Sequence, residues 1–120
     1  MKINLFKQLD ELRGINPQGI YLLSINNNCY IGSSMNIKKR LRHHRRELRL
    51  NIHDNKYLQN SYNKYKICEY EILEICNNLS IIDLRKLEKF WINKLNPKFN
   101  IQDPVSAIGG YNQKKVYQYS

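Results

Sequence analysis

The sequence predicts one α+β domain, because β-prone runs and segments with helical periodicity share a chain of only 120 residues. Two short β-prone runs within residues 19–32 are joined by asparagines, and a third run covers residues 67–76. Longer amphipathic segments begin near residues 36, 55 and 80, with helix-capping residues at their starts. A chain of this length can bury one core but not two.

Apolar residues near the chain start recur at helical spacing: Ile3, Leu5, Leu9 and Leu12. We therefore expect a short amphipathic helix over residues 2–12, which Gly14 and Pro17 bring to an end. This helix would form an N-terminal extension over residues 1–17.

The first two β-prone runs predict a hairpin, since asparagine tolerates the positive φ angles of tight turns. A two-residue Asn-Asn turn would place Tyr21 opposite Gly32. Tyr21 and Tyr30 would then be diagonal neighbours on one face of the hairpin.

The predicted helix over residues 36–50 sorts its side chains by face. Its narrow apolar stripe holds Ile37, Leu41 and Leu48, with His44 inside the stripe and Arg40 on its edge. His44 is either a core histidine with a satisfied partner or part of a site, because a buried imidazole beside a guanidinium needs partners. The cations outside the stripe are Lys38, Lys39, Arg42, Arg45, Arg46 and Arg49. They form either a solvated face or a phosphate-binding face.

A polar break around His53 precedes a predicted helix over residues 55–66 and a predicted strand over residues 67–76. Ser80 to Asp83 resembles a capping box that opens a third helix, which Pro97 ends. The apolar stripe of that helix consists of Leu84, Leu87, Trp91 and Leu95, and Glu88 lies in its middle. A carboxylate there must be protonated, paired or bound to a metal. Pairing with Arg40 and metal ligation both stay open.

Lysine and arginine number 20 against 10 acidic residues, which leaves a net charge of +10. Such an excess is typical of proteins that bind polyanions. We expect nucleic acid rather than an anionic membrane surface, since no segment has the pattern of a basic amphipathic helix with a bulky apolar face. No run approaches the ~18 apolar residues of a membrane span. The three cysteines lack zinc-site spacing, and the chain start does not resemble a secretion signal. We therefore expect an intracellular protein with reduced thiols.

These motifs together resemble the GIY-YIG nuclease family. The two tripeptides that name the family are matched by Gly19-Ile20-Tyr21 and Tyr30-Ile31-Gly32. The later matches are Arg40 and His44 in an Arg-x-x-x-His pattern, His53 as in intron-encoded members, Glu88, and Phe99-Asn100. The resemblance covers about residues 18–101, and it implies a three-stranded antiparallel β-sheet flanked by helices.

The resemblance also implies an endonuclease that hydrolyses DNA phosphodiesters with one divalent metal ion, Mg²⁺ or Mn²⁺. Glu88 would hold the ion, and Arg40 would bind the phosphate in its planar fork. Tyr21 would be the general base, and His44 is a candidate acceptor of its proton. The remaining implied positions are Tyr30 for water or phosphate, His53 for phosphate or proton relay, and Asn100 for orienting a phosphate or Glu88.

Structural alternatives stay open for three of these positions: Tyr30 as sheet packing, His53 as a loop histidine and Asn100 as a backbone cap. Some family members carry a lysine just after the second tripeptide, where this sequence has Ser33, Ser34 and Met35. No lysine is therefore assigned to assist the base, and Lys38 and Lys39 are the candidates on the following helix. Glu74 and Asp83 are possible second metal ligands without a spacing argument.

The match to His53 and to the segment around Trp91 is closest to the catalytic domain of intron-encoded, homing-type members. A repair or structure-specific nuclease is the alternative enzyme, and a nucleic-acid-binding module without catalysis is the alternative of another class. Residues 102–120 change in composition and predict a polar linker or tail. Residues 115–119 resemble the opening strand of small DNA-binding modules that follow such catalytic domains.

Overall fold

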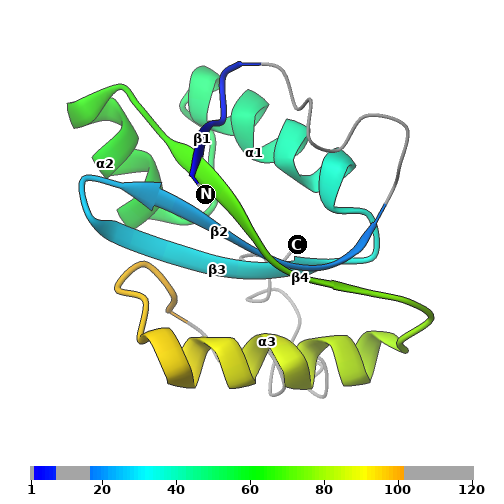
Figure 1. The fold of residues 1–120 in the computed structure, drawn as a ribbon. Helices are drawn as coiled ribbons and strands as arrows, with labels where there is room; N and C mark the ends of the chain where they lie inside the picture. The colour runs from blue at the N-terminus through cyan, green and yellow to red at the C-terminus, as the bar shows by residue number, and fades with distance from the viewer. Residues whose placement is uncertain (1, 8–16, 102–120) are drawn as a thin grey trace.

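The computed structural model describes residues 2–7 and 17–101, and it has the α+β architecture that the sequence predicts. Its elements are β1 (Ile3–Asn4), β2 (Gln18–Ile25), β3 (Asn28–Ser34), α1 (Ile37–Leu50), α2 (Lys56–Tyr65), β4 (Glu69–Cys76) and α3 (Ile81–Leu95). Figure 1 shows three layers, with the sheet between α1 and α2 on one face and α3 on the other. None of the helices described is long and apolar enough to span a membrane.

The sheet has the strand order β1-β4-β2-β3, and each neighbouring pair is antiparallel. The three predicted strands are β4, β2 and β3, and the short β1 adds a fourth at the edge of β4. The hairpin register is the predicted one, with Tyr21 opposite Gly32. Asn26 and Asn27 form its turn with φ angles of 48° and 68°, which confirms that both adopt the positive φ of a tight hairpin turn.

The described part of the segment predicted as a helix over residues 2–12 is not helical. Ile3 pairs with Tyr70 of β4, and the Leu5 amide donates to the Cys68 carbonyl at 2.8 Å. Leu5 is fully buried in the core. Backbone pairing with the open edge of β4 outweighs the weak helical periodicity of so short a segment. The rest of the predicted helix lies outside the described residues.

The helix starts agree with the predicted capping signals. Side chains of three cap residues accept hydrogen bonds from backbone amides of the first turn: Asn36 in α1, Asn55 in α2 and Ser80 in α3. Each helix ends at a residue in the left-handed conformation, and these residues are Asn51, Lys66 and Asn96. The helices therefore begin and end within about two residues of the predicted positions.

The sheet separates two apolar cores, and alternate residues of β2 enter each one. Tyr21 and Leu23 pack with Leu41 on the α1 and α2 side. Ile20 packs with Leu84 on the α3 side. All eight residues of β2 are consequently buried, and side chains of β2 reach both helix layers.

Candidate active site

The glycines of the two tripeptides stand where another group comes so close to the backbone that no side chain would fit. A β-carbon at Gly32 would lie 2.5 Å from the Tyr21 hydroxyl oxygen. A β-carbon at Gly19 would overlap the Glu74 carbonyl oxygen of β4. The β2–β4 register shifts just after this point, between Ile20 and Tyr21. The glycines thus let the Tyr21 ring lie across β3 and let β4 approach β2.

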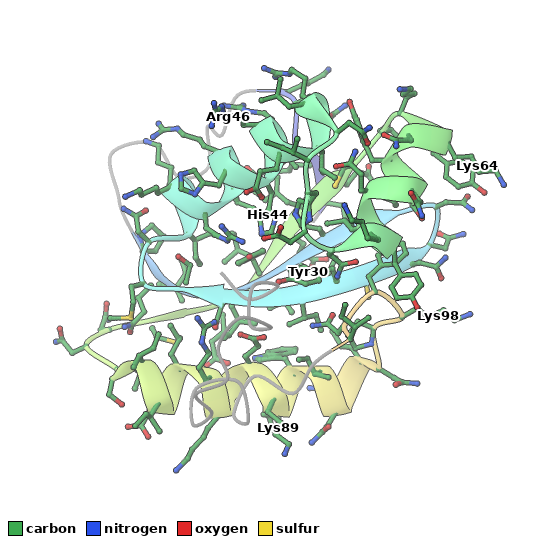
Figure 2. All side chains as sticks on the ribbon, turned by 180° about the vertical axis from the view of Figure 1, so that it is seen from behind. Tyr30, His44, Arg46, Lys64, Lys89 and Lys98 are labelled. Carbon is green, nitrogen blue, oxygen red and sulfur yellow. The ribbon has the colours of Figure 1, made fainter. Side chains whose placement is uncertain are left out.

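Tyr21 begins a chain of hydrogen-bonded rings that runs from the sheet into α1 and the following loop. The Tyr21 hydroxyl oxygen lies 2.6 Å from His44 Nε2, and His44 Nδ1 lies 2.8 Å from His53 Nε2. All three side chains are buried. The Tyr30 ring lies beside His44, with ring centroids 5.7 Å apart (Figure 2). Tyr21 and Tyr30 share one face of the hairpin, as predicted, and both contact the His44 ring.

His53 lies behind His44, in the loop between α1 and α2. Its backbone amide donates to Gln59 Oε1 at 3.0 Å, and its Nδ1 accepts from the Asn55 backbone amide at 3.1 Å. Only 1% of His53 is exposed. Positioning of a phosphate would need an accessible ring, so this buried position does not suit that alternative.

Burial and the charge of Arg40 set the protonation of these rings. Burial raises the pKa of Tyr21 to about 12, against the lowering effect of the Arg40 charge, and the nearby Glu88 charge raises it further. Burial, followed by the Arg40 charge, lowers the pKa of His44 well below its ordinary value and that of His53 to about 4. Both histidines are therefore neutral at neutral pH.

Arg40 is partly buried and faces both the buried rings and the surface. It lowers the pKa of Tyr21 through its charge and through a side-chain hydrogen bond. Its Nε is buried and has no hydrogen-bond partner among the described residues. Arg40 also lines a surface cleft of about 350 Å³, together with Ser34, Met35, Asn36, Lys39 and His43. An anion in this cleft would satisfy the unpaired donor.

Glu88 is fully buried, and its two oxygens have different surroundings. Ser33 Oγ donates to Oε1, and Arg85 Nη1 donates to the same oxygen at 3.2 Å. Arg85 also donates to Ser33 Oγ at 2.7 Å. Oε2 has no hydrogen-bond partner in the described part of the chain. The ion pair of Glu88 is thus with Arg85, one turn earlier on α3, and the alternative of pairing with Arg40 is wrong.

A divalent cation fits the unpartnered Oε2, because a buried carboxylate oxygen without a donor otherwise carries an uncompensated desolvation cost. Burial raises the pKa of Glu88 to about 7, against the lowering effects of Ser33 and Arg85, so a neighbouring cation would favour the ionised form. The two candidate second ligands, Glu74 and Asp83, instead line a separate cleft beside α3. Glu74 there accepts from Trp91 Nε1 at 2.9 Å.

Asn100 holds the outer edge of β3. Its Oδ1 accepts from the Ile31 amide and its Nδ2 donates to the Ile31 carbonyl, both at 2.8 Å. The preceding Phe99 amide donates to the Cys29 carbonyl at 3.0 Å. These contacts correspond to the backbone-capping alternative for Asn100, and the described contacts of Glu88 do not include it.

The cations on the outer side of α1 differ in exposure and in contacts. The exposed ones are Lys39, Arg42, Arg46 and Arg49. Arg46 lies on the side of α1 that faces away from the sheet (Figure 2). Arg45 donates to the Lys7 carbonyl at 3.2 Å, and Arg49 lies over the Phe6 ring, 5.6 Å from its centroid. Part of the predicted phosphate-binding face therefore contacts the N-terminal segment, and Lys38 is half-buried.

Three residues of the site were missed by sequence reasoning. Arg85 precedes Glu88 by three positions, and this helical spacing is a signal that could have identified it. Ser33 stands where some family members have a lysine, and it bonds the carboxylate instead. Asn55 carries no such signal, because it acts through its backbone amide.

The fold and the site define a class of enzyme. Tyr21 of β2 lies beside Arg40 of α1, and Glu88 of α3 keeps one open carboxylate oxygen near them, around one antiparallel sheet with helices on both faces. An open cation donor and an open carboxylate suit metal-assisted cleavage of a phosphodiester. The family described as the GIY-YIG catalytic domain matches residues 17–101, and the chain belongs to this family. It is therefore a GIY-YIG nuclease domain, and nucleases of this family are generally metal-dependent.

Intron-associated endonuclease 1 of Enterobacteria phage T4 is similar to this chain, with 35% identity over 95 residues. The match covers 77% of this chain and 38% of that protein, so the chain spans well under half of its relative's length. The solved catalytic domain of homing endonuclease I-TevI is 34% identical, with a TM-score of 0.65 over 72% of this chain and 99% of that one. A mutant of the same catalytic domain has 32% identity and a TM-score of 0.66, over 72% of this chain and 95% of its own.

Proposed function

We propose that this domain cuts DNA as the catalytic part of a homing-type endonuclease, using one Mg²⁺ or Mn²⁺ ion. The observation that carries the proposal is the pair of buried, unpartnered polar atoms, Arg40 Nε and Glu88 Oε2, near Tyr21. A cation donor and an anionic acceptor left open in one site suit a ligand that carries both charges, such as a metal-bound phosphodiester. The similarity to the T4 intron-associated endonuclease supports the homing-type assignment.

Each residue has a distinct part in this proposal. Glu88 holds the ion through Oε2, while Ser33 and Arg85 fix the other oxygen. The bound ion would neutralise charge that develops on the phosphate and the leaving oxygen. Arg40 binds a non-bridging phosphate oxygen from the cleft that it lines. Tyr21 is the general base for the attacking water, and Tyr30 orients that water or the phosphate.

DNA reaches the site across the α1 surface. The cleft beside Arg40 includes Lys39 and His43, and the exposed Arg42 and Arg46 follow on the same helix. Lys39, Arg42 and Arg46 supply the cations that neutralise backbone phosphates. The net charge of +10 supports a polyanionic partner. Such a nuclease acts inside the cell, and the three free cysteines are compatible with that location.

Incubation with supercoiled plasmid, with and without Mg²⁺, tests the proposal. Wild-type protein should relax or linearise the plasmid only with the metal, and Glu88→Ala should abolish cleavage while DNA binding persists. Loss of binding in step with cleavage would make Glu88 a structural residue. DNA binding without any cleavage by the wild type would favour the non-catalytic module, and cleavage restricted to branched DNA would favour a structure-specific nuclease.

A further inference from the structure

The backbone determines the direction of the hydrogen bonds between the two buried histidines. The Asn55 amide donates to His53 Nδ1 at 3.1 Å. A backbone N–H can only donate, so His53 Nδ1 must present its lone pair. Since neutral imidazole carries one N–H, the proton of His53 lies on Nε2.

The same reasoning extends along the chain of rings. The protonated Nε2 of His53 faces His44 Nδ1 at 2.8 Å, so His44 Nδ1 is the acceptor. The His44 proton then lies on Nε2, which faces the Tyr21 oxygen at 2.6 Å. Arg40 has no lone pair to offer, and its hydrogen bond to Tyr21 also runs toward the tyrosine oxygen. The Tyr21 oxygen therefore lies among donors.

We propose that the Asn55 amide, acting through His53, fixes His44 as a hydrogen-bond donor to Tyr21, so that His44 stabilises the tyrosine oxygen and does not take its proton. His53 and Asn55 are positioning residues in this arrangement. Tyr21 then gives its proton to a phosphate oxygen of the bound DNA and not to His44, and the resulting phenolate is held by His44 and Arg40. This catalytic consequence rests on the proposed function, whereas the hydrogen-bond direction does not.

The loop that carries His53 is tied to three elements, which keeps the Asn55 amide in place. Gln59 of α2 accepts from the His53 amide and donates to the Leu48 carbonyl of α1, both at 3.0 Å. The Asn55 side chain donates to the Phe99 carbonyl at 2.7 Å. The direction of the hydrogen bonds is thus built into the packing of α1, α2 and the segment after α3.

A metal ion between the histidines is the competing interpretation. Donor atoms of His44, Glu47 and His53 lie within 4.8 Å of one another. However, Glu47 Oε1 lies 3.8 Å from His53 Nε2, whereas His44 Nδ1 lies 2.8 Å from the same nitrogen. His53 Nε2 therefore bonds His44 and not Glu47. Ligation through His53 Nε2 would move its proton to Nδ1, where it would meet the Asn55 N–H. We therefore expect only weak binding of Zn²⁺ at these residues.

Nitrogen-15 NMR of the metal-free full chain tests the hydrogen-bond direction without any nuclease assay. The chain has three histidines, and a variant with exposed His43→Gln leaves only the two buried rings to assign. We expect Nε2 protonated and Nδ1 bare in both rings at pH 7.5. Protonation of Nδ1 in either ring would overturn the proposal. Zn²⁺ titrated into the same sample should leave these signals in place, and stoichiometric broadening of His53 Nε2 at micromolar Zn²⁺ would overturn it.

Two substitutions at His53 test the catalytic consequence. The His53→Gln amide can accept from Asn55 and donate to His44, so cleavage should fall by about tenfold or less, as for one altered hydrogen bond. His53→Glu offers His44 an acceptor and moves the His44 proton to Nδ1, so cleavage should fall by about 10²-fold or more. NMR reports the His44 tautomer of each variant independently.

The reverse order of activities, with His44 Nδ1 protonated in the faster variant, would show that His44 takes the tyrosine proton. If His53→Glu does not fold, the wild-type spectrum decides. If wild type does not cut DNA but has the expected tautomers, the proposed function fails and the hydrogen-bond direction stands.

Discussion

At the residue scale, the two oxygens of Glu88 have different functions: one makes structural hydrogen bonds, and the other is open to a ligand. Oε1 is held by Ser33 and Arg85, and Oε2 stays open. The hydrogen bonds to Oε1 fix the orientation of the carboxylate before a cation binds to Oε2. Residues around a metal ligand commonly favour metal binding by orienting the ligand in this way. Its position on an apolar stripe was predictable, and its partner on the same helix was not recognised.

The raised pKa of Glu88 gives the metal-free protein a defined pH dependence. Burial raises this pKa to about 7 in the folded state from 4.5, so the folded protein holds a proton that the unfolded chain has lost. Stability must therefore fall as pH rises from about 4.5 to about 7. Glu88→Gln should lack this fall and be more stable at pH 8, by on the order of 1–3 kcal/mol.

Denaturant unfolding at pH 5 and pH 8 with a chelator measures this difference. The exposed Asp83→Asn on the same helix is the control and should follow the wild type. Excess Mg²⁺ at pH 8 should stabilise the wild type and leave Glu88→Gln unchanged. Equal pH dependence in wild type and Glu88→Gln would show that this carboxyl is not the titrating group.

Tyr21 allows a second prediction at this scale. Tyr21→Phe keeps the packed ring but removes the oxygen that His44 contacts at 2.6 Å, so single-turnover cleavage should fall by about 10²-fold or more. Metal binding should change little, whereas stability should fall by about 1–3 kcal/mol because the buried His44 Nε2 loses its partner. Tyr30→Phe should be milder if that hydroxyl only orients a ligand, and the exposed Tyr57→Phe is a matched control. A near wild-type rate with an unaltered pH profile would place the general base elsewhere.

Arg40 is predicted to be sensitive to shape as well as charge. Arg40→Lys keeps a cation beside Tyr21, but an ammonium cannot reproduce the planar fork with its buried Nε. Cleavage should fall severely, by about 10²-fold, as for a lost transition-state donor. Lys39→Arg in the same cleft is the converse control, which should retain activity. Comparable rates for both variants would indicate that charge alone is needed.

At the element scale, local signals predicted most of the fold. The asparagine turn, the three capped helices and the face shared by Tyr21 and Tyr30 all follow from short-range rules, and the structure confirms them. Contacts between distant segments were not predictable in this way. The pairing of β1 with β4 depends on an edge 65 residues or more away in the chain, where Asn4 lies opposite Glu69. The role of Asn55 depends on a backbone amide, which the sequence does not display.

The outer face of α1 leads to a prediction about DNA affinity. Arg42→Gln combined with Arg46→Gln should weaken binding and reduce the salt slope by up to about 0.9 per lost phosphate contact. Arg45→Gln should mainly affect stability, because Arg45 contacts the Lys7 carbonyl. Fluorescence anisotropy over a series of salt concentrations measures the slope. A slope unchanged in the double variant would make these arginines solvated surface residues.

At the scale of the whole molecule, the outer edges of β4 and β3 are each partly paired with another segment of the chain. β1 pairs with the outer edge of β4, and the segment of Phe99 and Asn100 bonds Cys29 and Ile31 along the outer edge of β3. This pairing leaves fewer edge groups open to another sheet and fixes the strands that carry Tyr21 and its neighbours. The late aromatic-Asn motif is thereby given a physical role that does not require contact with the phosphate.

Asn100→Ala separates this role from a catalytic one. The substitution leaves the Ile31 amide and carbonyl without their present partners, so unfolding should become easier by about 1–3 kcal/mol. Cleavage measured well below the melting temperature should then stay within about tenfold of wild type, because the indirect effect is limited to a shift of β3. Asn93→Ala, an exposed amide on α3, is the control for losing an asparagine. Unchanged stability together with a loss of cleavage of about 10²-fold or more would instead assign Asn100 to the phosphate or to Glu88, as the family resemblance implies.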